Sequence, residues 1–471
     1  MLSIQFGVRV DMTSSAALSH TLMPIIGEAD DVETEKADKY VWETETGVRV
    51  TLRGTFNYHP KSYSVVDSVE IHTADGSLIM SAKDLKEYSW EHLYEDGDIE
   101  DILEQIDRGA SITGSPFSDV LVGGEDADIL NGAAGNDILK GLGGNDTLQG
   151  GNGNDTYFID GTGEINRNLA DPGIDTVKSS VGYSLGSRQE ILVLTGNGSI
   201  NGSGNAVSNK LIGNSGNNQL SGLGGNDHLE GGAGNDQLLG GMGNDLLVGG
   251  PGSDRLNGAG GDDVYAIANA TEINKNLSDP GVDTVRAIMT YTLGAQQENL
   301  ALLGTVNSNG TGNNKANVIT GNGKNNALAG SGGNDTLDGG SGADVLNGGQ
   351  GNDLLAGGGG NDIFLFNTAL SDSNVDTIMD FGGAGSVALD LIRLDDAIYS
   401  ALTTGALASS AFESGPGLTA AATTDGRIIF DTDTGALYYD ADGSGISFVA
   451  IQFAVIATDV DELSAADFAV M

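Results

Sequence analysis

A large apolar residue recurs every nine positions along three long stretches of the chain, two places after an aspartate or asparagine. One unit reads Gly141-Leu-Gly-Gly-Asn-Asp-Thr-Leu-Gln149, which predicts a six-residue turn followed by a three-residue strand with one inward apolar side chain. We count eighteen such units, in three blocks that begin at Gly114, Gly204 and Gly312. A period kept over this length indicates a stacked repeat structure.

Two units are expected to return the chain to its starting edge, so that eighteen residues make one coil. Leu130, Leu139 and Leu148 then stack in a thin apolar core between two parallel sheets. The predicted fold class is all-β. It is a parallel β-roll, a right-handed solenoid, in three blocks, flanked by a small β-rich N-terminal domain and a C-terminal β domain.

Changes in period and composition set the predicted domain boundaries. The N-terminal domain covers residues 1–113, the rolls cover 114–160, 204–267 and 312–366, two cap or linker segments cover 161–203 and 268–311, and the C-terminal domain covers 367–471. The two cap segments match each other at an offset of 108 residues. Because the last coil of a solenoid leaves its strand edges unpaired, we expect these segments to cover one roll and open the next.

The terminal domains lack the nine-residue period. Residues 48–53 and 68–72 alternate apolar and polar side chains, as half-buried strands do, and residues 99–106 have helical spacing. Near the other end, residues 427–431, 436–440 and 447–454 predict three antiparallel strands joined by Asp/Gly turns.

The net charge of −45 restricts the classes of partner that the chain can bind. Nucleic acid and anionic membrane surfaces are disfavoured, because both require basic side chains. The chain has no cysteine, which excludes disulfides and thiolate metal sites, and it has no long apolar run that predicts a transmembrane helix. Many carboxylates facing one another favour a divalent cation instead.

Alternate aspartates fall on the same edge of the predicted roll, Asp119, Asp137 and Asp155 on one side and Asp128 and Asp146 on the other. The candidate ligands for calcium are the sixth-place aspartates Asp119, Asp128, Asp137, Asp146, Asp155, Asp227, Asp236, Asp245, Asp254, Asp263, Asp335, Asp344, Asp353 and Asp362, with the fourth-place glycines Gly135, Gly144, Gly153, Gly225, Gly234, Gly243, Gly252, Gly333, Gly342 and Gly351.

Stacked carboxylates destabilise a metal-free roll. Neighbouring coils lie about 4.8 Å apart, and two charges at that spacing repel by roughly 3 kcal/mol at an effective dielectric near 20. Several bound Ca²⁺ ions, coordinated by aspartate and loop carbonyl oxygens, would reverse the sign of this interaction. Mg²⁺ fits less well because it demands octahedral geometry, and Zn²⁺ lacks Cys or clustered His. Ion binding and folding should therefore be one event.

The repeats are not uniform. Asparagine occupies the aspartate place in the first two units of the second and third rolls, at Asn209, Asn218, Asn317 and Asn326. An amide is a weaker calcium ligand, so we expect these opening coils to be held by backbone and asparagine hydrogen bonds. In the first roll, Phe117 and Asp126 replace the fourth-place glycine, which weakens the prediction for Asp119 and Asp128.

The repeat resembles the RTX family of secreted proteins of Gram-negative bacteria, over roughly residues 110–471. The resemblance implies calcium binding outside the cell and type I secretion, with the secretion machinery reading an uncleaved signal in the C-terminal region. Residues 376–381 look like the family's segment after the last roll, and no lysine or arginine follows Arg427. The N-terminus does not have the pattern of a signal peptide, which fits that route.

The resemblance does not imply an activity, because members of the family carry unrelated effector domains. The sequence contains neither His-Glu-x-x-His nor Gly-x-Ser-x-Gly, and no catalytic residue is predicted. We expect a structural, adhesive or matrix-associated role, with polysaccharide or other cell-surface material as a candidate partner. The alternative is a secreted enzyme, polysaccharide-modifying or hydrolase-like, with its activity in residues 1–113.

Overall fold

The computed structural model describes strands β1–β6, between residues 23 and 89, and the stretches 111–114, 116–124, 126–161, 163–164, 172–273, 280–382, 389–457 and 463–471. The predicted helix over residues 99–106 lies outside them. The described residues contain strands and two short 3-10 helices, η1 (Ser409–Ala411) and η2 (Ala465–Asp467), but no α-helix, so the all-β fold class is confirmed. The chain forms two compact units, residues 1–234 and 235–471.

Three-residue strands stack in parallel with the predicted coil length. In the first unit, β10 (Ile138–Lys140) lies between β8 (Val120–Val122) and β12 (Thr156–Ile159), and each residue pairs with one eighteen positions away. The opposite sheet repeats this register between β9 (Ile129–Ala134) and β11 (Thr147–Asn152). Eighteen residues therefore make one coil, as the sequence predicts.

The core is a stack of single apolar side chains. Leu130, Leu139 and Leu148 are at most 1% exposed, while the residues on either side of them in their strands are partly or fully exposed. One inward side chain per strand gives each coil little apolar area to bury, so packing alone contributes little stability per coil.

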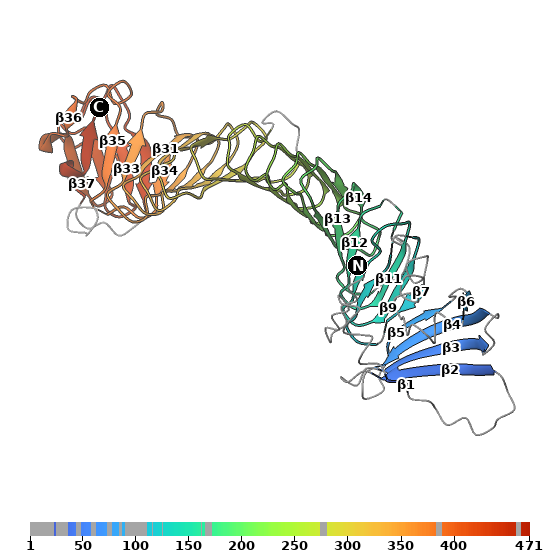
Figure 1. The fold of residues 1–471 in the computed structure, drawn as a ribbon. Coiled ribbons are helices and arrows are strands. Elements are labelled where there is room, and N and C mark those ends of the chain that lie inside the picture. Colours follow the sequence, from blue (N-terminus) through green and yellow to red (C-terminus); the bar gives the residue numbers. More distant parts are fainter. Residues whose placement is uncertain are drawn as a thin grey trace. The chain divides into compact units, whose positions relative to one another are not determined.

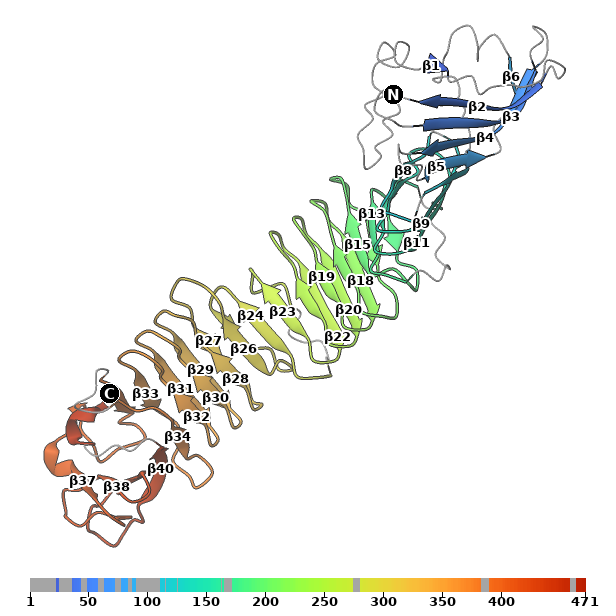
Figure 2. The same cartoon turned by 90° about the horizontal axis from the view of Figure 1, so that it is seen from below.

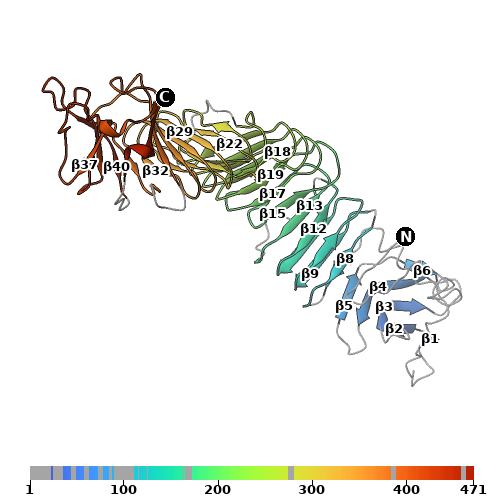
Figure 3. The same ribbon diagram turned by 90° about the vertical axis from the view of Figure 1, so that its left-hand side faces the viewer.

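The segment 161–203 contributes strands that pair with the end of the first roll and with the start of the second. Strand β13 (Thr176–Ser179) pairs in parallel with β12, and β15 (Ile191–Leu194) pairs with both β13 and β17 (Lys210–Ile212) (Figure 3). Val177 and Leu192 are fully buried at the core positions of these strands. The segment thus supplies further coils of unequal length to the same ladder.

The second unit repeats this arrangement. Strands β24 (Thr284–Ala287) and β26 (Asn299–Leu302) lie between β23 (Val264–Ile267) and β28 (Val318–Thr320), all in parallel (Figure 2). Segment 268–311 therefore also contributes strands between the two rolls.

The remaining solenoid strands follow the same pattern. In the first unit they are β14 (Tyr183–Ser184), β16 (Gly202–Ser203), β18 (Gln219–Gly224) and β19 (His228–Glu230). In the second unit they are β20 (Gln237–Met242), β21 (Leu246–Val248), β22 (Arg255–Gly260), β25 (Tyr291–Thr292), β27 (Gly310–Thr311), β29 (Ala327–Gly332), β30 (Thr336–Asp338), β31 (Val345–Gln350), β32 (Leu354–Ala356) and β33 (Ile363–Phe366).

An antiparallel meander covers one edge of the first unit's solenoid. It runs through β1 (Met23–Pro24), β2 (Lys36–Glu43), β3 (Arg49–Asn57), β4 (Tyr63–His72) and β5 (Leu78–Lys83), with β6 (Glu87–Ser89) paired to β4. Strands predicted over 48–53 and 68–72 are confirmed by β3 and β4. Strand β7 (Ser111–Thr113) pairs with β5 on one side and with β9 on the other, so the meander satisfies the edge of the ladder (Figure 1).

The C-terminal residues cover an edge of the second unit's solenoid. The last ladder strands, β34 (Asp376–Ile378) and β35 (Leu391–Leu394), pair in parallel with β40 (Ile451–Ile456) and β41 (Phe468–Val470). The other strands are β36 (Gly405–Ala406), β37 (Phe412–Gly415), β38 (Ile428–Asp431) and β39 (Ala436–Tyr439). The three predicted antiparallel strands are confirmed as β38, β39 and β40, although β40 begins later than predicted, at Ile451.

Aromatic side chains fill the space that the thin leucine core leaves in this terminal region. Phe453 packs edge-to-face against Phe366 and Tyr399, with ring centroids 5.2 and 5.4 Å apart. Within the described stretches, no helix has the length and hydropathy needed to cross a membrane.

Candidate metal centres

The sixth-place aspartates form files along the edges of the coils. The backbone N–H of Asp119 donates to Oδ1 of Asp137, and the N–H of Asp137 donates to Oδ1 of Asp155, both at 2.7 Å. Asp128 donates in the same way to Asp146. These contacts give the two files that the sequence predicts. The same hydrogen bond joins Asp236 to Asp254, Asp245 to Asp263, Asp335 to Asp353, and Asp344 to Asp362.

In six of these carboxylates, the second oxygen is buried without a hydrogen-bond donor. This holds for Oδ2 of Asp146, Asp254, Asp335, Asp344, Asp353 and Asp362, whose side chains are at most 3% exposed. An ionised oxygen removed from water with no compensating contact destabilises the fold strongly. The geometry therefore calls for a proton or a cation at each of these positions.

The space beside the first-place glycines is lined by oxygens. A Cβ atom at Gly339 would lie 2.6 Å from Oδ2 of Asp344 and 2.6 Å from the carbonyl oxygen of Gly357 in the next coil. A carboxylate oxygen and a main-chain carbonyl thus converge on one cradle that only glycine leaves open. Oxygen donors of this mixed kind suit Ca²⁺.

The fourth-place glycines have a different requirement. Nine of the ten candidate positions have φ between 98° and 137°, the left-handed region that side chains rarely adopt; Gly252, which follows Pro251, is not among them. At Gly342, a Cβ would also lie 2.7 Å from the backbone of Lys324 in the coil behind. These glycines bring two loops close enough to share their carbonyl oxygens.

Side chains alone do not complete a metal site. Over the stretches that the structure describes, no point gathers three or more His, Asp or Glu side chains. A site between two coils would combine two carboxylates with main-chain carbonyls, so the loop conformation matters as much as the aspartates. The residues present fit calcium in this way.

Burial raises the pKa of several file aspartates, as expected for carboxylates without a bound cation. Desolvation raises the pKa of Asp335 to about 7, with the charge of Asp353 adding to the effect. Desolvation likewise raises the pKa of Asp362 and of Asp146 to about 6. Without a cation, burial therefore disfavours the charged form of these carboxylates.

In the coils that carry asparagine at the sixth place, the side-chain amide forms hydrogen bonds through its oxygen and its nitrogen. Oδ1 of Asn317 accepts the N–H of Asn313 at 2.8 Å, and its Nδ2 donates to the carbonyl of Glu298 at 3.0 Å. Asn209 makes the same pair of contacts, with the N–H of Asn205 and the carbonyl of Gln189. The amide supplies the donor that a carboxylate lacks, which confirms the expected asparagine hydrogen bonds.

Four further aspartates belong to the files although the sequence analysis did not assign them. Asp175 and Asp283 accept the N–H of Asp155 and Asp263 at 2.9 and 3.0 Å, and Asp376 and Asp390 accept that of Asp353 and Asp362 at 3.2 and 2.8 Å. A signal was present, since Gly173-Ile-Asp-Thr-Val177 and its copy at 281–285 keep the fourth, sixth and eighth places of the repeat.

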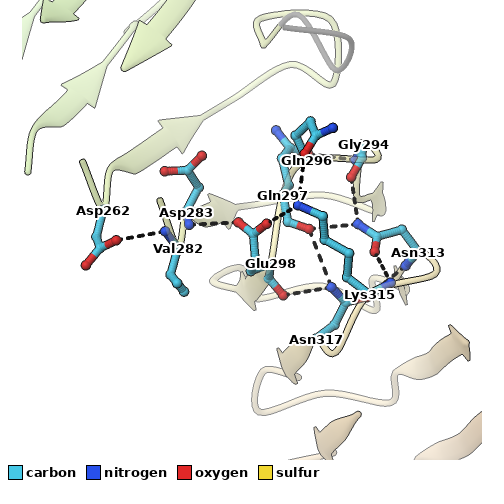
Figure 4. A network of polar contacts seen from close by, with 10 residues as sticks. All are labelled: Asp262, Val282, Asp283, Gly294, Gln296, Gln297, Glu298, Asn313, Lys315 and Asn317. Atoms are coloured by element: carbon cyan, nitrogen blue, oxygen red, sulfur yellow. Dashed lines mark hydrogen bonds and ion pairs between the residues drawn. The ribbon is translucent and has the colours of Figure 1, made fainter. Parts of the chain in front are cut away.

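Figure 4 shows how the inserted coil of the second unit ends its file. The N–H of Asp283 donates to Oε2 of Glu298 at 3.0 Å, while the ammonium group of Lys315 contacts Oε1 at 2.6 Å. Asn313 and Asn317 donate to main-chain carbonyls beside it. Here the chain supplies its own cation.

Comparison with known families agrees with this geometry. The RTX calcium-binding nonapeptide repeat matches residues 111–139, 132–160, 203–238, 212–247, 239–266, 311–346 and 339–366. No curated protein matches the chain. These matches, on a parallel β-solenoid with carboxylate files, identify residues 111–160, 203–266 and 311–366 as RTX calcium-binding repeats.

Proposed function

We propose that the protein is a secreted calcium-binding scaffold whose rolls bind several Ca²⁺ ions and fold as they bind. The buried second oxygen of the file aspartates, repeated coil after coil, is the observation that supports this function. In Asp146, Asp254, Asp335, Asp344, Asp353 and Asp362, one carboxylate oxygen is fixed by the coil behind it, and the other is left for a ligand.

The proposed ligands are the sixth-place aspartates together with the loop carbonyls that the glycines expose. Bound calcium would supply positive charge between carboxylates that otherwise repel one another. The side chains are already oriented by the N–H bonds along the file, so few rotamers remain to be fixed on binding. The thin core cannot stabilise the coils alone, which makes folding dependent on the ion.

Calcium concentration then separates two states of the chain. Sites of the extracellular class bind with dissociation constants of about 10⁻⁴–10⁻³ M, far above the calcium level of a cytosol. The chain would remain unfolded inside the cell, suitable for type I export through a signal in its C-terminal region, and would fold outside. A net charge of −45 supports an extracellular structural, adhesive or matrix-associated role.

Circular dichroism of the full chain tests the coupling. We expect a large gain in β-structure on raising Ca²⁺ from chelated to millimolar levels, and Mg²⁺ at equal concentration should not replace it. Equal β content and equal thermal midpoint in EDTA and in calcium would contradict the proposal. Binding of the folded chain to a polysaccharide array would then identify surface material as a partner, and turnover of an arrayed sugar would favour the enzyme alternative.

A further inference from the structure

Two glutamates continue an aspartate file beyond the repeats. Glu164 stands eighteen residues after Asp146, and Glu272 stands eighteen residues after Asp254. Both lie outside the residues that match the RTX repeat. They occupy corresponding positions in the two duplicated segments, so the molecule contains the same arrangement twice.

Each glutamate is buried with one oxygen used and one oxygen left over. Glu164 is 1% exposed, and its Oε2 accepts the N–H of Asp160 at 3.0 Å, while its Oε1 has no hydrogen-bond partner. Glu272 is also 1% exposed, its Oε2 accepts the N–H of Ala268 at 3.2 Å, and its Oε1 has no partner. In the file aspartates the used oxygen accepts an N–H of the preceding coil, whereas here it accepts an N–H four residues earlier, and in both cases the other oxygen is left over.

The aspartate eighteen residues earlier lies on the adjacent coil and also has an oxygen left over. The N–H of Leu148 donates to the carbonyl of Glu164 at 3.2 Å, which holds the coil of Asp146 against that of Glu164. Oδ2 of Asp146 is buried without a partner, and its charge acts on Glu164. Asp254 and Glu272 repeat both features.

We propose that the pairs Asp146–Glu164 and Asp254–Glu272 each bind a divalent cation, calcium, at the end of their file. The inference rests on the proposed calcium-dependent function and adds two sites to it. The longer glutamate side chain reaches back to the preceding coil where the inserted segment departs from the nine-residue period. Main-chain carbonyls would complete each site, as between the regular coils.

A competing explanation is a proton shared between the carboxyl groups. Burial and then Asp160 raise the pKa of Glu164 to about 8, and burial raises that of Glu272 to about 7. A neutral carboxyl group and a cation both relieve the repulsion, but only the cation needs the charge of the glutamate. Replacement by glutamine therefore distinguishes the two.

The copies differ at an exposed position four residues before each glutamate. Asp160 of the first copy corresponds to Ala268 of the second, 108 residues later. An extra carboxylate near the site adds attraction for a divalent ion, and one charge at an assumed separation of about 7 Å in a solvent-like dielectric gives roughly a tenfold gain in affinity. The first site should therefore fill at a lower calcium concentration than the second.

Native mass spectrometry of the full-length chain counts bound ions directly. Glu164→Gln and Glu272→Gln should each bind one Ca²⁺ fewer than the parent at saturation, and the double variant two fewer. Asp372→Asn removes an exposed carboxylate outside the files and should bind as many ions as the parent. Unchanged counts in both glutamine variants would overturn the inference in favour of a shared proton.

A gain-of-charge variant covers the case in which a glutamine variant does not fold. Ala268→Asp removes no side-chain contact. It should lower the calcium concentration that fills the site at Glu272 by roughly tenfold. An unchanged titration would count against a site at Glu272. If the parent chain itself binds no calcium, the proposed function fails, which is distinct from a parent that binds calcium and variants that match it.

Discussion

The backbone N–H of Asp344 donates to Oδ1 of Asp362, eighteen residues later, at 2.8 Å. This contact fixes one oxygen of the later carboxylate and leaves its Oδ2 buried without a partner. The same hydrogen bond that orders the file thus orients every aspartate toward the neighbouring loop. The same arrangement orients the carboxylates for calcium and places their charges close together. It therefore stabilises the coils with calcium bound and destabilises them without it.

Asp344→Asn should change stability with opposite sign in the two states. In calcium, loss of a charged ligand should remove an ion and lower the free energy of unfolding by about 1–3 kcal/mol. In EDTA, removing one of the facing charges should raise the residual β content. Scanning calorimetry in calcium and circular dichroism in EDTA check this, with Asp372→Asn as the control, and a loss of structure in both buffers would contradict it.

Asn326→Asp should destabilise the opening coil of the third roll even in calcium. Nδ2 of Asn326 donates to the carbonyl of Ser308, and a carboxylate there would face that oxygen without a proton. We expect a loss of about 1–3 kcal/mol in the free energy of unfolding, measured by denaturant titration at saturating calcium. A stabilised variant with one more bound ion would show that this coil accepts calcium after all.

Acid should stabilise the metal-free protein. Burial raises the pKa of Asp335 to about 7 and that of Asp376 to about 8, above the value near 4 of an unfolded aspartate. The folded state therefore binds more protons, so the stabilisation is complete below about pH 4 and is lost as the pH rises through 6–8.

The corresponding measurement is the β content in EDTA at pH 5 and pH 8, by circular dichroism, which should be larger at pH 5. With calcium present the order should reverse, because protons compete with the ion for the same oxygens. A metal-free chain that is more stable at pH 8 would contradict the desolvation argument.

Gly342→Ala tests the loop geometry without touching a carboxylate. Gly342 has a φ of 135°, and an added Cβ would contact the backbone of Lys324, so we expect about 1–3 kcal/mol of destabilisation. Gly323→Ala is the matched control, because a Cβ at Gly323 meets nothing within 4 Å. Similar calcium titrations for both variants would argue against a role for the fourth-place loop.

A variant that destabilises the folded C-terminal region should still be exported. Phe468, in β41, is 1% exposed, and Phe468→Ala should weaken the folded protein by about 3–5 kcal/mol. Its export should be normal if the signal is read in an unfolded chain, whereas deletion of residues 422–471 should abolish export. Normal secretion of the truncated chain would refute the proposed signal.

The coil length, the leucine stack and the two aspartate files could be predicted because each residue of a unit has one role at a fixed place. Asp137 and Leu139 are positioned by the period alone. The inserted coils could not be placed, because the spacing from Asp155 to Asp175 is twenty residues and the nine-residue phase is lost. Pairing with the neighbouring coil, which the sequence does not encode locally, restores the register there.

The glutamates at the ends of the files were missed for a related reason. Glu164 keeps the eighteen-residue distance from Asp146 but replaces the consensus aspartate, and no glycine-rich turn precedes it in full. Only the burial of its side chain and its unused oxygen distinguish it from a surface glutamate.

The coils closed by Asn209 and Asn317 need no ion to satisfy their side chains. They therefore give each of these two ladders an internal nucleus from which ordering spreads as calcium becomes available. Folding would then begin at fixed coils rather than at random positions along the chain. Residue-resolved hydrogen exchange at sub-saturating calcium would reveal that order, as protection that declines with distance from the asparagines.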